Sequence, residues 1–393
     1  MQGRGRRVAI TGFGVVAPCG IGRQAFWQGL LGPATSATKS VEFADWDPSP
    51  YYASPKDARR ADAVEQFATA SAIEAFEHAG RPDVDPLRFG AIWGTGIGGL
   101  RTLEEQVELR LAKGDKRVSP FLVPMMMGNA SGAAISMRYG LQGPVETICT
   151  ACAAATHAIG YAARMIAWDR CDAMVTGGSE AAATLTSLGG FNNMTALSTT
   201  GSSRPFDVAR DGFVMGEGAA TFILEEWDGA VARGATIHGE ILGAASTADA
   251  HHITAPAPGG AGAIHCMRLA LDDSGLQPGD IAQINAHGTS TPLNDAAEAA
   301  AVETVFGPNG PPMTSTKGVT GHALGAAGAL EAAAVLLSMQ HRLIPPTAGT
   351  TTLPDDMHVD VVIGSPREWT PGPTLSNNFG FGGHNGSVII GHI

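Results

Sequence analysis

The sequence carries Cys149-Thr150-Ala151-Cys152-Ala153-Ala154-Ala155, a run of small residues that joins two different patterns. The β-branched run 145–148 before it predicts a strand, and the Ala-rich stretch 156–168 after it predicts a helix. Cys152 is therefore expected where a strand ends and a helix begins. A thiol at a helix N-terminus gains thiolate character from the local positive potential. Because the small neighbours also leave room for a bulky substrate, Cys152 is predicted to be a nucleophile.

The alternation of strand and helix patterns continues along the chain in both directions. Predicted strands include 8–16, 91–93, 173–176, 221–224 and 387–390, and predicted helices include 61–78, 261–273 and 328–341. Such alternation is typical of an α/β fold with buried sheets. A soft seam near 228–236 divides the chain into residues 1–235 and residues 236–393, and no sequence repeat is obvious across it.

Composition argues against several classes of protein. The chain has 393 residues, of which 44% are hydrophobic, so it can bury a sizeable core. A net charge of −12 argues against a nucleic-acid-binding surface. Five cysteines, an odd number in a large chain, do not suggest a disulfide framework, so a reduced cytoplasmic setting is expected. No segment is long and apolar enough to span a bilayer, and Gly12 and Gly14 interrupt the run that could imitate a signal peptide.

Two further motifs have simple structural interpretations. Gly12-Phe13-Gly14-Val15-Val16-Ala17 matches G-x-G-x-x-A, but Pro18 and Gly20 interrupt the helix that a dinucleotide site needs, so a tight turn is expected. Cys149 and Cys152 form a C-x-x-C pair, which admits a redox site or half of a zinc site. Because no second C-x-x-C accompanies the pair, no metal site is expected, and Cys149 is interpreted as a small residue that ends its strand.

Two histidines lie in Gly-rich settings farther along the chain. His287 belongs to Asn285-Ala286-His287-Gly288-Thr289-Ser290-Thr291, and His322 follows Lys317-Gly318-Val319-Thr320-Gly321. Both histidines are expected after strands, and Lys317 at a strand end. A thiol with two separate imidazoles is suited to carbon–carbon bond formation on thioesters. A papain-like cysteine hydrolase is the alternative, but it needs only one histidine and leaves the second unexplained.

The fourth motif is Asn378-Phe379-Gly380-Phe381-Gly382-Gly383-His384-Asn385-Gly386, near the C-terminus. Taken in order, the four motifs resemble those of the elongating β-ketoacyl-[acyl carrier protein] synthases, also called condensing enzymes. The resemblance implies the thiolase fold, an α/β architecture in which two similar βαβαβ halves form five αβαβα layers. Residues 1–235 would be the half with the nucleophilic cysteine, and residues 236–393 the half with both histidines.

The resemblance also implies a reaction. Cys152 takes an acyl group from acyl carrier protein, and malonyl-carrier protein then loses CO₂ beside His287 and His322. Two neutral imidazoles can each offer an N–H to the enolate oxygen that forms. Lys317 would orient or polarise this pair. The product is a 3-oxoacyl chain on the carrier protein. Since the substrates arrive on phosphopantetheine, no bound cofactor or metal is expected.

Further residues match positions that the family uses. The amides of Cys152 and Phe381 would form the oxyanion hole, and Phe381 would gate the acyl pocket. The other matches are Thr289 and Thr291 for the phosphopantetheine arm, Met127, Phe379 and Gly380 for the substrate-binding surface, Arg59 and Arg60 for docking of the acidic carrier protein, and Glu298 and Glu331 as supporting acids. A homodimer is expected, and a heterodimer with a chain-length factor is the alternative.

Differences from related enzymes narrow the range of activities that the resemblance allows. Thiolases use a second cysteine as base, but the only cysteine after residue 236 is Cys266, in a predicted helix. Initiating synthases have an asparagine where this chain has His322, and inactive chain-length partners lack the nucleophile. The main prediction is therefore an active elongating synthase for fatty acids, polyketides or polyenes.

The alternatives are the catalytic ketosynthase of a type II polyketide synthase, a non-catalytic carrier-binding subunit and the hydrolase. Three departures from the family pattern suggest a specialised acyl chain: His384, a short segment at 52–62, and Met125-Met126-Met127.

Overall fold

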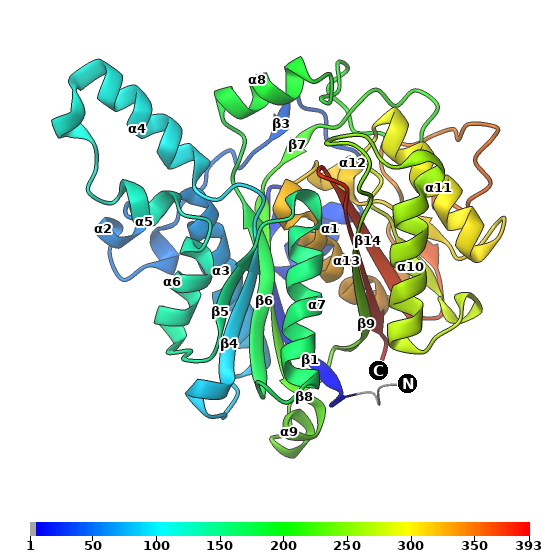
Figure 1. Ribbon diagram of the computed structural model, residues 1–393, viewed down its shortest axis with the longest axis horizontal. Coiled ribbons are helices and arrows are strands. Elements are labelled where there is room, and N and C mark those ends of the chain that lie inside the picture. The colour runs from blue at the N-terminus through cyan, green and yellow to red at the C-terminus, as the bar shows by residue number, and fades with distance from the viewer. Residues whose placement is uncertain (1–4) are drawn as a thin grey trace.

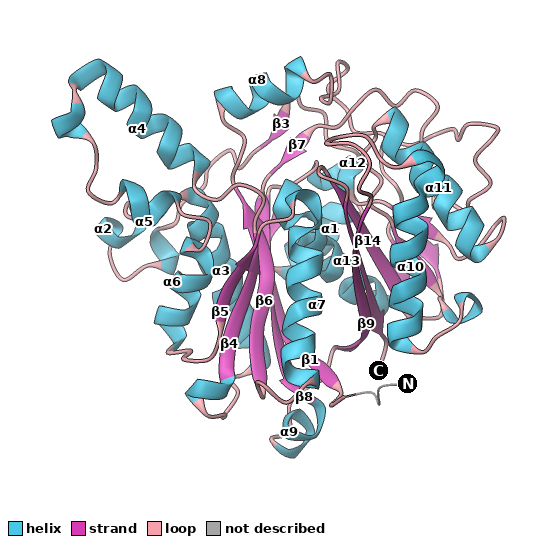
Figure 2. Cartoon of the chain, in the orientation of Figure 1, coloured by secondary structure: helices cyan, strands magenta, loops and turns pink. Residues whose placement is uncertain are grey.

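Two groups of five strands form the frame of the molecule (Figure 2). The computed structural model describes residues 5–393. The N-terminal group contains β1 (Val8–Ala17), β4 (Phe89–Gly94), β5 (Val145–Ile148), β6 (Ala173–Glu180) and β8 (Gly218–Glu226). The C-terminal group contains β9 (Gly239–Ala248), β10 (Gln283–Asn285), β11 (Met313–Thr314), β14 (Thr374–Gly380) and β15 (His384–Gly391).

Both groups have the same topology. If the strands of each group are numbered in chain order, their order across the sheet is 3-2-4-5-1 in both. The pairings also agree: β1–β8 and β8–β6 are antiparallel, as are β9–β15 and β15–β14, and the remaining pairs are parallel. The duplication that no sequence repeat revealed is therefore present in the strand order. A short antiparallel contact between β1 and β9 joins the two groups into one continuous sheet.

Helices occupy three layers, one between the strand groups and one on each outer side (Figure 1). The central layer holds α7 (Ala154–Ala167) and α13 (Ala327–His341), which pack against strands of both groups. The outer layers hold α3 (Ala63–Ala79) and α6 (Ala130–Tyr139) on the N-terminal side, and α10 (Ala261–Ser274) and α11 (Pro292–Phe306) on the C-terminal side. This is the five-layered αβαβα arrangement of the thiolase fold.

The central helices lie close together because their residues are small. α13 is apolar on nearly all sides, as expected for a buried helix. A Cβ on Gly328 would lie 2.1 Å from the hydroxyl of Thr156 on α7, so only glycine permits this approach. Each central helix is preceded by a short 3₁₀ turn, η4 (Ala151–Ala153) or η7 (Leu324–Ala326), and the two turns contact each other. The N-terminal ends of both helices therefore meet at one point.

The remaining elements are shorter or lie at the periphery. They are β2 (Gly20–Ile21), α1 (Arg23–Leu30), β3 (Ser40–Val41), η1 (Ser49–Tyr51), α2 (Pro55–Ala58), η2 (Pro86–Arg88), α4 (Leu100–Lys113), η3 (Asp115–Arg117), α5 (Leu122–Met126), α8 (Leu185–Asn193), β7 (Met215–Gly216), α9 (Trp227–Ala232), η5 (Pro258–Gly260), η6 (Pro278–Asp280), α12 (Lys317–Thr320), β12 (Leu343–Ile344) and β13 (Arg367–Glu368). Figure 1 shows α4 projecting from the body of the molecule beside α2 and α5.

Two local predictions are wrong. Gly12 and Gly14 lie inside β1 rather than in a turn after it. A Cβ on Gly14 would lie 2.1 Å from the backbone oxygen of Ser71, so these glycines allow β1 to pack tightly against α3. His322 follows the short helix α12, not a strand, because the chain turns there and keeps Lys317 inside the protein.

Candidate active site

A cavity of about 500 Å³ lies where the central helices begin. Its wall includes Cys152, His287 and His322, which come from different parts of the chain. Apolar side chains, among them Phe213 and Leu324, line the same cavity. The predicted nucleophile and both predicted histidines are therefore brought together in a space that can hold a substrate.

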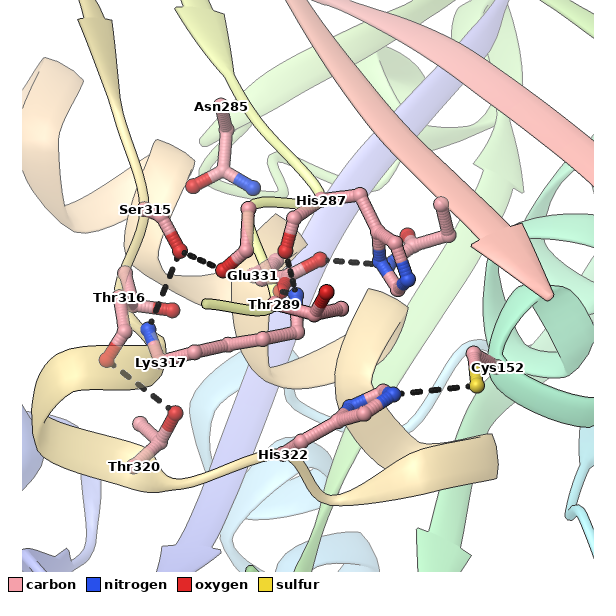
Figure 3. Close-up of polar contacts among 12 residues, drawn as sticks. Cys152, Asn285, His287, Thr289, Ser315, Thr316, Lys317, Thr320, His322 and Glu331 are labelled. Atoms are coloured by element: carbon pink, nitrogen blue, oxygen red, sulfur yellow. Dashed lines mark hydrogen bonds and ion pairs between the residues drawn. The ribbon is translucent and has the colours of Figure 1, made fainter. Parts of the chain in front are cut away.

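Cys152 lies in η4 and is 7% exposed. His322 Nε2 lies 3.1 Å from its Sγ (Figure 3). Burial raises the pKa of the Cys152 thiol to about 12, and the charge of Lys317 and the backbone amide of Phe381 oppose this only in part. The thiolate character expected from the helix N-terminus is thus outweighed by desolvation. The thiol is protonated at neutral pH, and His322 Nε2 is the imidazole nitrogen in contact with it.

The two imidazoles face each other nearly at right angles. Their ring centroids are 5.3 Å apart with an interplanar angle of 81°, and both rings are buried. Burial, with a smaller contribution from the charge of Lys317, holds the pKa of both histidines well below the usual value of 6.5. Both side chains are therefore neutral at pH 7, in the form that the reaction implied by the resemblance requires.

Lys317 is 1% exposed, so the alternative interpretation of a surface lysine does not apply. Its Nζ donates to the backbone oxygen of His287 and forms an ion pair with Glu331 of α13 (Figure 3). Glu331 also accepts a hydrogen bond of 2.7 Å from Asn378 Nδ2, which lies 3.3 Å from His287 Nδ1. Lys317 and Glu331 therefore hold His287 in place through its backbone and through Asn378.

Glu298 of α11 supports the loop that carries His287. Its carboxylate accepts the backbone N–H groups of His287 and Gly288 at 2.8 and 2.7 Å. Burial raises the pKa of Glu298 to about 8, although these two hydrogen bonds lower it. Beyond this loop, the hydroxyls of Thr289 and Thr291 lie 2.9 Å apart and line the cavity. Both threonines are therefore accessible from the cavity, and their contact with the phosphopantetheine arm stays a prediction.

The C-terminal glycine-rich turn forms the opposite wall. Phe379, Gly380 and Phe381 all line the cavity. A Cβ on Gly380 would lie 3.0 Å from the amide nitrogen of Cys152, so a side chain there would crowd Cys152. The backbone amides of Phe381 and Cys152 both interact with the Cys152 thiol. The two amides expected to form the oxyanion hole therefore point to the same place.

Three predicted site residues lie away from this cavity. Arg59 and Arg60 are exposed at the end of α2, and the Arg60 guanidinium lies 4.3 Å from the ring centroid of Phe121. Met127 follows α5, is 43% exposed and does not line the cavity of the single chain.

Sequence reasoning missed several residues that position the site. Glu180, at the end of β6, accepts the amides of Gly96 and Gly325 at 2.6 and 3.0 Å, and burial raises its pKa to about 7. An acid at the end of a buried strand was the available signal. Asp249 accepts hydrogen bonds from Asn385 Nδ2 at 2.7 Å and from the amide of Ala257 at 2.9 Å. Asp249 thereby ties a cavity-lining loop to the glycine-rich turn, which no local pattern indicated.

Comparison with known proteins assigns the family. Residues 34–230 match the model of the β-ketoacyl synthase N-terminal domain, and residues 238–351 match that of its C-terminal domain. The chain belongs to the β-ketoacyl synthase family. Members of this family are condensing enzymes, acyltransferases that form carbon–carbon bonds, and the chain is an enzyme of this kind.

Similar proteins span the whole length of this β-ketoacyl synthase. It is 41% identical to 3-oxoacyl-[acyl-carrier-protein] synthase 2 of Synechocystis sp., over 97% of this chain and 96% of the relative. It is 40% identical to the protein of the same name from Coxiella burnetii, over 99% of both chains. Within the described residues, 5–393, no helix has the length and apolarity needed to cross a bilayer.

Solved structures agree with the fold of this synthase. A chain of the ishigamide ketosynthase/chain length factor matches with a TM-score of 0.92 and 32% identity, covering 99% of this chain and 100% of the other. A type II polyketide ketosynthase, solved with its acyl-carrier protein and bound to a hexaketide, matches with a TM-score of 0.87 and 30% identity, covering 99% and 100% of the two chains.

Proposed function

We propose that this enzyme joins a malonyl unit to an acyl group held on Cys152, by decarboxylative Claisen condensation, and releases a 3-oxoacyl chain on acyl carrier protein. The observation that carries the proposal is the buried cluster of one thiol and two neutral imidazoles inside an apolar cavity. The full-length relatives named 3-oxoacyl-[acyl-carrier-protein] synthase 2 support the same reaction.

In the first half-reaction, the Cys152 sulfur attacks the carbonyl carbon of an acyl thioester. The negative oxygen that forms is stabilised by the amides of Cys152 and Phe381. The tetrahedral intermediate then collapses, and the phosphopantetheine thiol leaves with the proton that Cys152 has lost. His322 Nε2, 3.1 Å from the sulfur, is placed to carry that proton. The acyl group is then bonded to Cys152.

In the second half-reaction, the bond between the malonyl carboxylate and its α-carbon breaks and CO₂ leaves. The electron pair remains as an enolate, whose oxygen accepts hydrogen bonds from the imidazoles of His287 and His322. Its carbon attacks the acyl carbonyl, and the Cys152 thiolate leaves. One proton from solvent then restores the thiol, which balances the negative charge that the malonyl carboxylate brought in. Nε2 of His322 contacts Cys152, whereas Nδ1 has no hydrogen-bond partner within residues 5–393. No hydrogen bond at Nδ1 therefore fixes which ring nitrogen carries the hydrogen. Substrates bring their own phosphopantetheine, and the proposed reaction uses no metal or bound cofactor.

The test separates the two half-reactions in the purified enzyme. His287→Ala and His322→Ala should each slow CO₂ release from malonyl-carrier protein by about a hundredfold or more, since each removes an oxyanion donor. Acyl transfer to Cys152, measured by mass spectrometry, should decline less. Cys152→Ala should abolish acyl-enzyme formation, and Cys149→Ala should retain most activity because Cys149 lies outside the cluster. Undiminished CO₂ release in both histidine variants would contradict the proposal.

The surface supports an assembly of two subunits. β5 is an edge strand, and Val145 on it is exposed together with Val123, Met127 and Met137 on α5, the following turn and α6. Exposed apolar side chains of this kind are typical of an interaction surface. A homodimer would cover them and would bring Met127 of one subunit near the partner's cavity, where its bulk would limit chain length.

The residue boundary at 235/236 between the two halves is supported by the gap between the family matches at 230 and 238.

A heterodimer is the second candidate. Two of the structurally similar proteins are ketosynthases solved with a chain length factor, one of them 32% identical to this chain. The catalytic subunit of a type II polyketide synthase is therefore the alternative function, with the same chemistry at Cys152. Light scattering and an activity assay of the chain expressed alone distinguish the two. Only the homodimer would form and be active without a second gene product. A cytoplasmic location accompanies either version, and the five free cysteines are consistent with a reducing compartment.

A further inference from the structure

We propose that Cys152, His287 and His322 also form a binding site for a thiophilic divalent cation such as Zn²⁺, and that this cation inhibits the enzyme reversibly. Each residue offers one ligand atom, and the three atoms lie within 4.8 Å of one another. All three side chains are buried. The cation site shares its residues with the proposed function, but it depends on their geometry and not on the reaction.

The donor set is one that zinc prefers. Zn²⁺ binds thiolate sulfur at about 2.3 Å and imidazole nitrogen at about 2.0–2.1 Å, usually with tetrahedral geometry. Tetrahedral angles then require neighbouring ligand atoms to be about 3.3–3.6 Å apart. Cys152 Sγ and His322 Nε2 are 3.1 Å apart, and the nitrogen of His287 lies within 4.8 Å of both. Each separation therefore has to change by about 1.5 Å or less before a cation can bind between the three atoms.

The surroundings hold the ligands and leave one position open. His287 is fixed through its backbone by Lys317 and Glu298, and Cys152 is fixed within η4, whose backbone packs against Gly380 of the glycine-rich turn. The cavity of about 500 Å³ in front of the cluster provides the entry path and room for water as a fourth ligand. Three protein ligands with one open position is an arrangement in which zinc exchanges ligands readily.

Charges near the cluster act on a cation in both directions. The Lys317 ammonium lowers the pKa of both histidines and so opposes a nearby cation, but it also favours the Cys152 thiolate that the cation needs. The charged groups that face it are Lys317, which is paired with Glu331, and the carboxyls of Glu180 and Glu298. On binding, the Cys152 S–H bond breaks, the sulfur electron pair forms the bond to the metal, and one proton passes to solvent. The bound cation would occupy the nucleophile and both imidazoles together, so both half-reactions would stop.

Cys149 provides an internal control. It forms the C-x-x-C pair with Cys152 in sequence, but it is exposed and its thiol donates to the backbone oxygen of Gly96 at 3.1 Å. It is not part of the three-residue cluster. The cation is therefore expected at Cys152 and the two histidines, and not at the C-x-x-C pair.

The experiment titrates the reduced, substrate-free protein with Co²⁺ and Zn²⁺. Co²⁺ should bind one equivalent per chain, with the intense visible bands of tetrahedral coordination and a thiolate-to-cobalt charge-transfer band. Zn²⁺ should displace Co²⁺, block alkylation of Cys152 by iodoacetamide and inhibit the enzyme until a chelator is added. Cys152→Ser, His287→Gln and His322→Gln should each weaken binding at least about tenfold, since even partners outside the ligand set contribute this much. Cys149→Ala should bind like the unmodified enzyme.

Melting temperatures show which variants remain folded, and only folded variants are compared. Unchanged affinity in all three ligand variants, unchanged alkylation of Cys152 at saturating Zn²⁺, or no stoichiometric binding by the folded enzyme would each overturn the proposal. The binding readouts contain no substrate. A chain that binds Co²⁺ here but condenses no thioester would refute the proposed function alone, and an active enzyme without this metal site would refute the present inference alone.

Discussion

Cys152 has a raised pKa, and this determines how its reactivity changes with pH. Since the folded-state pKa of the thiol is about 12, its thiolate fraction should increase nearly tenfold for each unit of pH between 7 and 10. The rate of Cys152 alkylation by iodoacetamide should therefore rise across this range without reaching a plateau. A plateau near pH 7 would instead indicate a thiolate–imidazolium pair with His322.

The buried ion pair of Lys317 and Glu331 makes a prediction about stability. Lys317→Met leaves the Glu331 carboxyl buried without its ammonium partner, so the free energy of unfolding should fall by about 3–5 kcal/mol. The double variant Lys317→Met/Glu331→Met should lose less than the sum of the two single variants, because no unpaired charge remains. Urea denaturation measures both values. Strict additivity would show that the two side chains do not interact.

Individual site residues differ in how far the sequence could predict them. Cys152, His287 and His322 stand in short motifs with small neighbours, and local sequence was enough to single them out. Asn378 was inside a motif but received no role, because its contacts are with Glu331, 47 positions earlier, and with His287, 91 positions earlier. The raised pKa of Cys152 was also beyond sequence reasoning, because desolvation depends on everything that surrounds the thiol.

Among the elements, the central helices α7 and α13 carry the sharpest prediction. Gly328→Ala should place a Cβ 2.1 Å from the hydroxyl oxygen of Thr156 and 2.7 Å from Asn378 Oδ1, closer than these atoms can approach without moving. Overpacking of this kind destabilises a protein by about 1–3 kcal/mol. Because Thr156 donates to Asn378, CO₂ release should also slow.

Gly190→Ala is the matched control. Gly190 lies in α8, and a Cβ at this position would meet no other heavy atom within 4 Å, so alanine there should stabilise the helix by about 0.5–1 kcal/mol. Thermal unfolding of the two variants should therefore shift in opposite directions. Equal shifts would show that the crossing of α7 and α13 tolerates a larger side chain.

Elements with long periodic patterns were predictable, and those set by tertiary contact were not. The predicted helix 261–273 is α10, Ala261–Ser274, and the predicted strand 145–148 is β5. The glycines of β1 imitated a turn because their close approach to α3 is invisible in one sequence. α12 was missed because four residues carry no period, and its position depends on where Lys317 is buried.

At the scale of the whole molecule, the distribution of charge leads to a prediction about docking. The chain has a net charge of −12, yet Arg59 and Arg60 are exposed at α2, and Lys113, Lys116 and Arg117 are exposed on the neighbouring arm of α4 and η3. Charge reversal at Arg59 and Arg60 should raise the KM for carrier-bound substrate and weaken its salt dependence, because an acidic carrier protein is attracted through such groups. The kcat should change little.

Arg268→Glu serves as the control for this surface. Arg268 is exposed on α10, and Figure 1 shows α10 on the opposite side of the molecule from α2. This single charge reversal, half of the change made at Arg59 and Arg60 together, should leave the KM unaltered. If both reversals raise the KM equally, overall charge rather than a docking surface is responsible, and if neither does, the carrier protein binds elsewhere or on a partner subunit.

The burial of Lys317 has a practical consequence for following the molecule in time. An amine that is 1% exposed cannot meet a water-soluble acylating reagent while the surrounding layers are closed. Labelling of Lys317 therefore requires that the centre of the protein open, whereas exposed lysines such as Lys56 react at once. The rate at which Lys317 gains mass therefore measures how often the centre of the protein opens. This rate can be followed in mixtures where no activity assay is possible.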